Sequence, residues 1–324
     1  MFRPAVLTAP FLLSAVLSAQ PPHPPAQSGA RPETESGSIA AEGIRRLRVS
    51  SLGAVTANGS DGARIEYRLI RRARNSGENE ARRHPSPALQ VNRSGGTLTL
   101  TVDMPGDASF PPRLELTIPK RLPEIQIDTV SGALQLYGLG GHTAAETGGG
   151  PIRIGQIDGS LSVRTGGGPI EADSVRLGLR CLTAGGDIRV RRAGGETFLE
   201  TGGGEILVEE ASAALQALTA AGNVEVLRAL SDVAARTMGG LIKVHDASGQ
   251  VTAETRGGGI QVGAARGVRC EAAAGGVRLR NVSGAVNVST VSGPILAEIV
   301  RGLPLESSKL HAARGDITVL IPSN

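Results

Sequence analysis

The chain has 324 residues and a net formal charge of +4, with 45 Gly and no Trp, two Tyr and four Phe. These few aromatic side chains cannot fill the wide core of a large β-sandwich or of a doubly wound α/β enzyme. The buried interior must therefore be narrow and filled by aliphatic side chains. The high glycine content predicts repeats or a fibrous fold. The scarcity of aromatics argues against nucleic-acid binding and against an aromatic sugar-stacking site.

The N-terminus has the pattern of an export signal followed by a linker. A basic residue precedes an apolar stretch from Ala5 to Val16, and small residues follow it. This stretch is shorter than the ~20 residues that a membrane span needs. We therefore predict a signal peptide over 1–19 and no transmembrane span in the mature chain. Residues 20–42 are rich in Pro, Ser and charge, which predicts a disordered tether.

Short β segments follow over residues 43–128. Apolar and polar residues alternate in stretches such as "ARIEYRLI" and "GTLTLTVDM", as in half-buried strands. We expect an irregular β region that caps the repeat behind it, because bare solenoid ends template aggregation. A charged stretch over 71–87 interrupts it and predicts a solvated loop. Its arginines are candidate contacts for polyanions, namely Arg71, Arg72, Arg74, Arg82 and Arg83.

From residue 129 to 324 the chain repeats itself. An anchor threonine followed by a Gly-rich triplet recurs every 18 residues, at Thr147, Thr165, Thr183, Thr201, Thr219, Thr237 and Thr255. Within each repeat the apolar residues have a period of two, and glycine runs are unfavourable in helices. The pattern predicts an all-β fold, a single-stranded parallel β-helix or solenoid with 18-residue coils. Coils stacked about 4.8 Å apart would form a thin rod.

Three details of the coil follow from its columns. The anchor threonines should stack as a ladder, with methyls toward the core and hydroxyls bonded to neighbouring coils. The glycines behind them should supply the positive φ of a tight corner. Cys181 and Cys270 fall in one inward column, five coils or about 24 Å apart. That separation excludes a disulfide and predicts two buried free thiols. The stretch 302–311 and the closing strand "DITVLIP" should cap the C-terminal end.

The order of motifs carries a family resemblance. It comprises a signal peptide, the opening "LRVSSLGAVTANGSDGARIEY", the junction "RLELTIPKRLPEIQIDTVSGALQL" and T-x-G-G-x-I-x-V repeats. Over residues 43–321 this order resembles the bacterial putative-adhesin β-strand-repeat family, a domain of unknown function related to auto-transporter-adhesin-like solenoids. The resemblance implies an exported right-handed β-helix without established catalytic residues. "Adhesin" is a label in that family rather than a demonstrated activity.

Residues with catalytic potential are scattered. None of the five histidines has the spacing of a zinc site, so we expect no metal, no cofactor and no catalytic residue. A polysaccharide-processing β-helix enzyme would gather carboxylates on one face, and the candidates are Glu171, Asp187, Glu205 and Glu225. Basic residues such as Arg153, Arg189 and Lys243 alternate with them, which favours charge pairs between coils.

The predicted function is binding or structural. Leu182, Phe198 and Leu218 fall at outward positions of neighbouring coils and are candidates for an apolar contact surface. We predict an exported, non-enzymatic solenoid that acts as a structural or adhesin-like surface module of the bacterial envelope, in the periplasm or at the cell surface. Its candidate partners are an envelope polysaccharide or a surface protein. The alternatives are a polysaccharide-processing β-helix enzyme and a self-assembling envelope scaffold.

Overall fold

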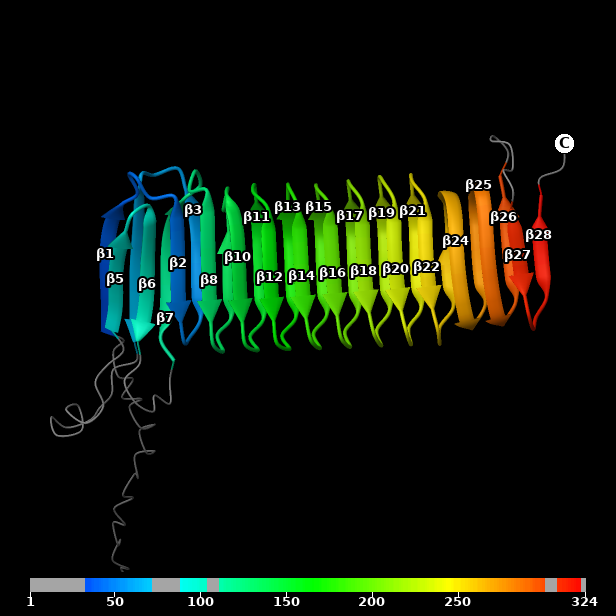
Figure 1. Ribbon diagram of the computed structural model, residues 1–324, viewed down its shortest axis with the longest axis horizontal. Helices are drawn as coiled ribbons and strands as arrows, with labels where there is room; N and C mark the ends of the chain where they lie inside the picture. The colour runs from blue at the N-terminus through cyan, green and yellow to red at the C-terminus, as the bar shows by residue number, and fades with distance from the viewer. Residues whose placement is uncertain (1–32, 72–87, 104–110, 301–307, 322–324) are drawn as a thin grey trace, which may run out of the picture.

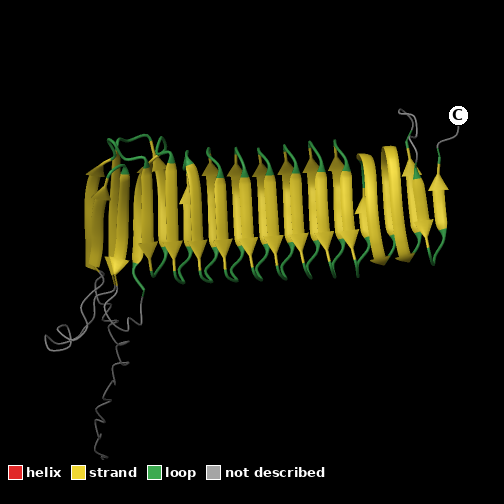
Figure 2. Ribbon diagram, in the orientation of Figure 1, coloured by secondary structure: helices red, strands yellow, loops and turns green. Residues whose placement is uncertain are grey.

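The protein is a long two-faced β rod (Figure 1). The structure is a computed structural model that describes residues 33–71, 88–103, 111–300 and 308–321. These residues form 28 strands and no helix (Figure 2), so none of them belongs to a helix that could cross a membrane. The predicted all-β solenoid is confirmed.

Each coil contributes one strand to each face, and the two faces run in opposite directions (Figure 1). Face 1 consists of β9 (Leu134–Tyr137), β11 (Ile152–Ile157), β13 (Ile170–Val175), β15 (Ile188–Ala193), β17 (Ile206–Ala211), β19 (Val224–Ala229), β21 (Ile242–Ala247) and β23 (Ile260–Val262). Face 2 consists of β8 (Glu124–Thr129), β10 (His142–Thr147), β12 (Leu161–Thr165), β14 (Leu179–Thr183), β16 (Thr197–Thr201), β18 (Leu215–Thr219), β20 (Val233–Thr237), β22 (Val251–Thr255) and β24 (Ala265–Ala274).

The remaining strands form the two ends of the rod. At the C-terminal end lie β25 (Val277–Ser292), which passes from one face to the other, β26 (Ile295–Ile299), β27 (Lys309–Ala312) and β28 (Ile317–Leu320). At the N-terminal end lie β1 (Glu33–Ala40), β2 (Arg46–Ser51), β3 (Val55–Ser60), β4 (Arg64–Arg71), β5 (Ala88–Ser94), β6 (Thr97–Asp103) and β7 (Arg113–Pro119).

The 18-residue register is confirmed by the strand pairing. Ile152 pairs with Ile170, and the same offset holds along both faces. One coil is a residue shorter, so that Thr255 pairs with Ala272. The inward columns are filled by Ile, Val, Leu, Ala and Thr side chains that are almost wholly buried. Because two short strands face each other at every level, the interior has room for small and medium-sized side chains but not for aromatic ones.

The N-terminal strands do not stack in chain order. The coil formed by β2 and β3 lies between the coil of β6 and β7 and the coil of β8 and β9. Beyond them, β4 and then β1 extend face 1, and β5 extends face 2, all through antiparallel pairing. This irregular region caps the solenoid as predicted. Its interleaved order had no signal in the sequence.

The predicted tether over 20–42 is wrong for residues 33–40. These residues form β1, which pairs along its whole length with β4. The Tyr67 ring lies where a side chain at Gly37 would be, and Ile39 packs against the edge of the core. A polar segment is ordered here because a ready-made edge supplies its hydrogen bonds, which composition alone does not reveal. The signal peptide and residues 20–32 lie outside the described residues.

The glycines of the regular coils serve a different purpose from the one predicted. Positive φ angles occur at eight glycines among the described residues, and none of these lies between residues 139 and 266. The third residue after each anchor threonine is nevertheless glycine. A Cβ on Gly168 would overlap the carbonyl oxygen of Gly150 in the preceding coil. Glycine is required because the backbones of successive coils approach too closely for a side chain.

The anchor threonines are buried and form a continuous chain of hydrogen bonds. The Thr201 hydroxyl donates to the carbonyl oxygen of Gly186 in the preceding coil, at 2.8 Å, and accepts from the amide of Gly204, at 3.1 Å. The same pair of bonds recurs at each anchor threonine from 147 to 255. Each hydroxyl thus satisfies two backbone groups at a corner where no strand partner exists.

Both cysteines are buried and unpaired. Burial raises the pKa of the Cys270 thiol to about 12 and also raises the pKa of Cys181, because a thiolate is poorly solvated in the aliphatic interior. Thiols in an unfolded chain ionise at about pH 8.5. Since the folded thiols stay protonated there, the fold loses stability as the pH rises above about 9 toward 12.

We therefore expect iodoacetamide at mildly alkaline pH to leave both cysteines unmodified in the native protein. Addition of urea at the same pH should make both of them react. Mass spectrometry of the alkylated protein measures this. A Cys181–Cys270 crosslink in the non-reduced protein would contradict the coil register.

The C-terminal end is open among the described residues. The closing strand β28 was expected to be a cap, but it is a strand of the last coil and pairs only with β26. Ile317 and Val319 stand in register with the buried Ile295 and Ala297, yet they are 44% and 38% exposed. They are exposed because no described coil stacks on them. The rest of the expected cap falls mainly on residues 301–307, which lie outside the described residues.

Candidate binding groove

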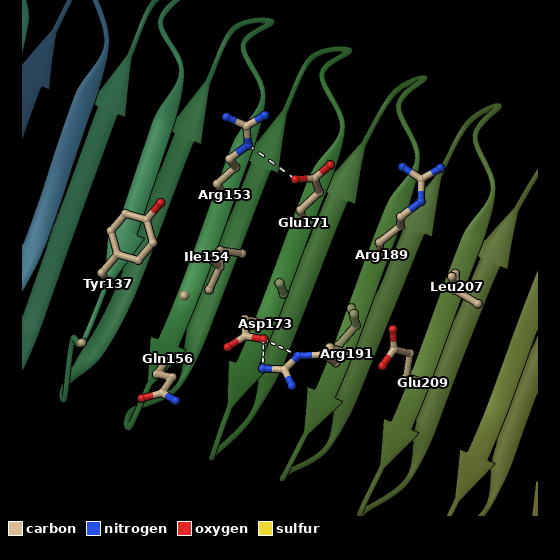
Figure 3. Close-up of a pocket in the computed structure, with 14 residues that line it drawn as sticks. Tyr137, Arg153, Ile154, Gln156, Glu171, Asp173, Arg189, Arg191, Leu207 and Glu209 are labelled. Atoms are coloured by element: carbon tan, nitrogen blue, oxygen red, sulfur yellow. Dashed lines mark hydrogen bonds and ion pairs between the residues drawn. The ribbon is translucent and has the colours of Figure 1, made fainter.

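Face 1 carries a groove along the rod axis, which we call the face-1 groove (Figure 3). It is a hollow of about 770 Å³ across β9, β11, β13, β15 and β17. The residues that line it, apart from glycines, are Tyr137, Arg153, Ile154, Gln156, Glu171, Ala172, Asp173, Arg189, Val190, Arg191, Leu207 and Glu209. Two rows of outward side chains stand on either side of a low floor, because alternate residues of each strand point outward.

The first row carries charges of alternating sign. Arg153, Glu171 and Arg189 follow one another on adjacent strands. Arg153 Nε lies 3.4 Å from Glu171 Oε2, so this predicted pairing between coils is confirmed. Arg189 instead pairs with Asp187 of its own coil, at 3.0 Å. These side chains are about half exposed, so each pair contributes little to stability and remains accessible to a ligand.

The second row carries Asp173, Arg191 and Glu209. Arg191 forms an ion pair with Asp173 of the preceding coil, which holds the guanidinium across the lower side of the groove (Figure 3). Glu209 follows one coil further and makes no ion pair with any described residue. The two rows together contain three arginines and three carboxylates, so the charges of the lining side chains sum to zero.

An aromatic ring closes one end of the groove. Tyr137 is the last residue of β9, and its ring leans over Gly155 of the next coil, where any Cβ would overlap it. The residue is 38% exposed, and Figure 3 shows the ring at the end of the groove, one strand before Arg153 and Gln156. Sequence composition argued against an aromatic sugar-stacking site along the solenoid, and that expectation stays a prediction, although Tyr137 is an exposed aromatic residue within the regular coils. The sequence does contain a signal for this arrangement, because Gly155 occupies the position that Tyr137 occupies one coil earlier.

The predicted apolar surface on face 2 is not continuous. Leu182 and Leu218 lie in one column with Glu200 between them. Phe198 lies in another column, and the Arg180 guanidinium stacks over its ring at 4.3 Å from the centroid. All three apolar side chains are half-buried. Charged side chains therefore divide this surface, although a second hollow of about 870 Å³ passes over Leu182 and Leu218.

Of the predicted arginine cluster, the structure describes only Arg71. Its guanidinium forms a 2.6 Å ion pair with Glu35 of β1, which ties the N-terminal strand to β4. Arg72, Arg74, Arg82 and Arg83 lie outside the described residues, so their role in polyanion binding stays a prediction.

The candidate catalytic carboxylates take part in polar contacts. Glu225 accepts from His245 at 2.8 Å and from Lys243 at 3.1 Å, and these two contacts hold its pKa below the usual range. Asn223 donates to Glu205 at 3.1 Å. Within the part of the chain that the structure describes, His, Cys, Asp and Glu side chains form no group of three suited to a metal ion.

The fold and the groove define a parallel β-solenoid with a groove on one face that is lined by charged side chains and one aromatic residue. No family model matches the chain, and no curated protein matches it. Among solved structures, it is similar to a putative adhesin from Bacteroides fragilis, with 14% identity over 89% of this chain and 97% of that one and a TM-score of 0.28. A putative adhesin from Parabacteroides distasonis has 10% identity over 88% and 97%, with a TM-score of 0.33.

A putative lipid binding protein, also from Parabacteroides distasonis, has 14% identity over 89% of this chain and 96% of that one, with a TM-score of 0.26. The adhesins bear the same label as the family that the sequence motifs resemble.

Proposed function

We propose that this chain is an exported, non-enzymatic binding module of the bacterial envelope, and that the face-1 groove is its binding surface. The observation that carries this proposal is the groove itself, in which polar side chains and one aromatic ring are presented at regular spacing on a rigid support. Regular parallel pairing holds each strand of the groove on both sides. A rigid scaffold lowers the entropic cost of binding an extended partner.

Export is supported by the sequence of residues 1–19. A non-enzymatic role is supported by the ion-paired state of Glu171 and Asp187, which lie on an open face rather than in an enclosed cleft. Ionised carboxylates paired with arginines are poor general acids, because a general acid must hold its proton near neutral pH.

The proposed function is tested by cell fractionation and a pull-down. The full chain, expressed with its own N-terminus in a bacterium, should appear outside the cytoplasm. Its mass should be that of a chain whose first residue is Gln20. The purified mature protein should be retained on washed envelope fragments in a saturable way. Retention in the cytoplasm at full length, or no retention on any envelope fraction, would overturn the proposal.

A second candidate function is assembly of two copies through their C-terminal ends. Among the described residues, the outer edges of β27 and β28 have no strand partner, and Ile317 and Val319 are exposed beside them. Both observations favour it, because such an edge is a template for further pairing. The N-terminal end also has edge strands, because β1 and β5 each pair on one side only among the described residues. The arrangement we propose is the symmetric one, in which two C-terminal edges meet and the exposed Ile317 and Val319 face the partner copy.

If two copies meet in this way, light scattering should give a dimer mass at micromolar concentration. Val319→Asp should then give a monomer, because a buried carboxylate would face the partner edge. Val91→Asp, at an exposed position of β5 on the opposite end, is the matched control and should remain dimeric. A monomeric wild-type protein would exclude this candidate.

A further inference from the structure

The chemical character of the face-1 groove narrows the class of its ligand. Its charges cancel, with Arg153, Arg189 and Arg191 set against Glu171, Asp173 and Glu209. A polyanion would meet the three carboxylates, and a polycation would meet the three arginines, and in either case like charges would lower the affinity. The groove therefore suits a ligand without net charge that can both donate and accept hydrogen bonds.

An extended peptide fits this surface poorly. A peptide gains much of its affinity on a β surface by pairing with a free strand edge. Each groove strand from β11 to β17 is already paired with a strand on both sides. The floor also offers no deep apolar pocket for a side chain, since Ile154, Ala172 and Val190 point inward.

A hydroxyl-rich chain of sugar rings fits better. Guanidinium and carboxylate groups alternate along both walls at the coil spacing of about 4.8 Å, which is comparable to the length of one sugar ring. Hydroxyl groups can accept from the arginines and donate to the carboxylates. The half-exposed ion pairs remain open to such contacts.

Tyr137 adds a platform at one end of the same groove. Its ring lies over Gly155, and 38% of the residue remains exposed. The negative face of an aromatic ring attracts the weakly positive C–H groups of a sugar ring. Arg153 and Gln156 lie on the next strand, β11, above and below Tyr137 in Figure 3, and both can form hydrogen bonds with the hydroxyls of a sugar chain that continues from the ring.

We infer that the face-1 groove binds a neutral polysaccharide, with one sugar stacked on Tyr137 and the following sugars along the two charged rows. The inference rests on the proposed binding function and names the ligand class for it. The ligand lies along the rod axis, across the strands of successive coils.

The test measures binding of hexasaccharides to the full mature chain by calorimetry. The neutral probes are cellohexaose, laminarihexaose and chitohexaose, and hexagalacturonate is the acidic probe. At least one neutral probe should bind, and hexagalacturonate should bind at least about tenfold more weakly. Tyr137→Ala should weaken neutral binding about tenfold or more, and Asp173→Asn should weaken it by a similar factor. Tyr137→Phe should retain most of it.

Phe198→Ala is the matched control, because it removes a half-buried aromatic ring from face 2. It should leave the affinity within about twofold of the wild type. Circular dichroism establishes that each variant keeps its β structure, so a loss of binding is not a loss of fold.

Three results would overturn the inference. These are binding of the acidic probe alone, neutral binding that is insensitive to Tyr137→Ala, and failure of every neutral probe to bind. If the protein is nevertheless retained on envelope fragments, the proposed function stands and only the ligand class is wrong. If no fragment retains it, the proposed function fails as well.

Discussion

Replacing Gly168 with alanine is expected to destabilise the solenoid by about 2 kcal/mol or more. The new methyl group would overlap the carbonyl oxygen and carbon of Gly150. Gly150 lies in the short turn between β10 and β11, and both of these strands are paired with the neighbouring coils. The two coils must therefore move apart to relieve the contact. The change is measured as a lower midpoint of urea unfolding, followed by circular dichroism.

Gly167 supplies the control within the same turn. A Cβ at Gly167 would have no neighbour within 4 Å, and its φ lies outside the positive range. Gly167→Ala should therefore be neutral or stabilise the fold by about 0.4–1 kcal/mol, since alanine restricts the unfolded chain. Equal destabilisation by the two substitutions would show that close approach between coils is not the reason for the glycine.

Thr201→Val is the second substitution for which we expect a large effect, a loss of about 1–3 kcal/mol. Valine keeps the shape of the side chain and fills the same buried space. It removes the hydroxyl that joins the amide of Gly204 to the carbonyl oxygen of Gly186. The Gly204 amide is then left inside the protein without a partner, and its lost hydration is not compensated.

Thr201→Ser distinguishes the contribution of the hydroxyl group to stability from that of the methyl group. Serine keeps both hydrogen bonds and loses one methyl from the core, which costs about 0.8 kcal/mol. Urea unfolding of the two variants under the same conditions gives the comparison. If serine were as destabilising as valine, or more so, the hydroxyl ladder would not be what stabilises this corner.

The solenoid was predictable because the 18-residue repeat of the sequence is also the length of one coil of the structure. A strand with inward Ile152 and Ile154 and outward Arg153 has the same pattern in the next coil, so each column of the sequence is a column of the structure. The buried thiols and the Arg153–Glu171 pair followed from that register alone. The reason for the glycines did not follow, because it is a contact with the backbone of another coil rather than a property of the local turn.

Part of the groove was also predictable. The charged rows can be read from the outward columns, and Arg153, Glu171 and Arg189 had been placed on one face. The direction in which Tyr137 leans could not be read, because it depends on the space left by Gly155 in the adjacent coil. The division of the Leu182, Phe198 and Leu218 surface likewise depends on the conformations of Arg180 and Glu200.

The amino-acid sequence by itself determined the all-β class, the coil length, the aliphatic interior and the pairing register from residue 129 onward, since each follows from a repeating local pattern. The tertiary structure alone decided the interleaving of β2 and β3, the ordering of β1, the edge that β27 and β28 leave open among the described residues, and the aromatic end of the groove. These features arise between segments that are distant in the chain or differ from the repeat. Their stability comes from contacts that only the folded chain brings together.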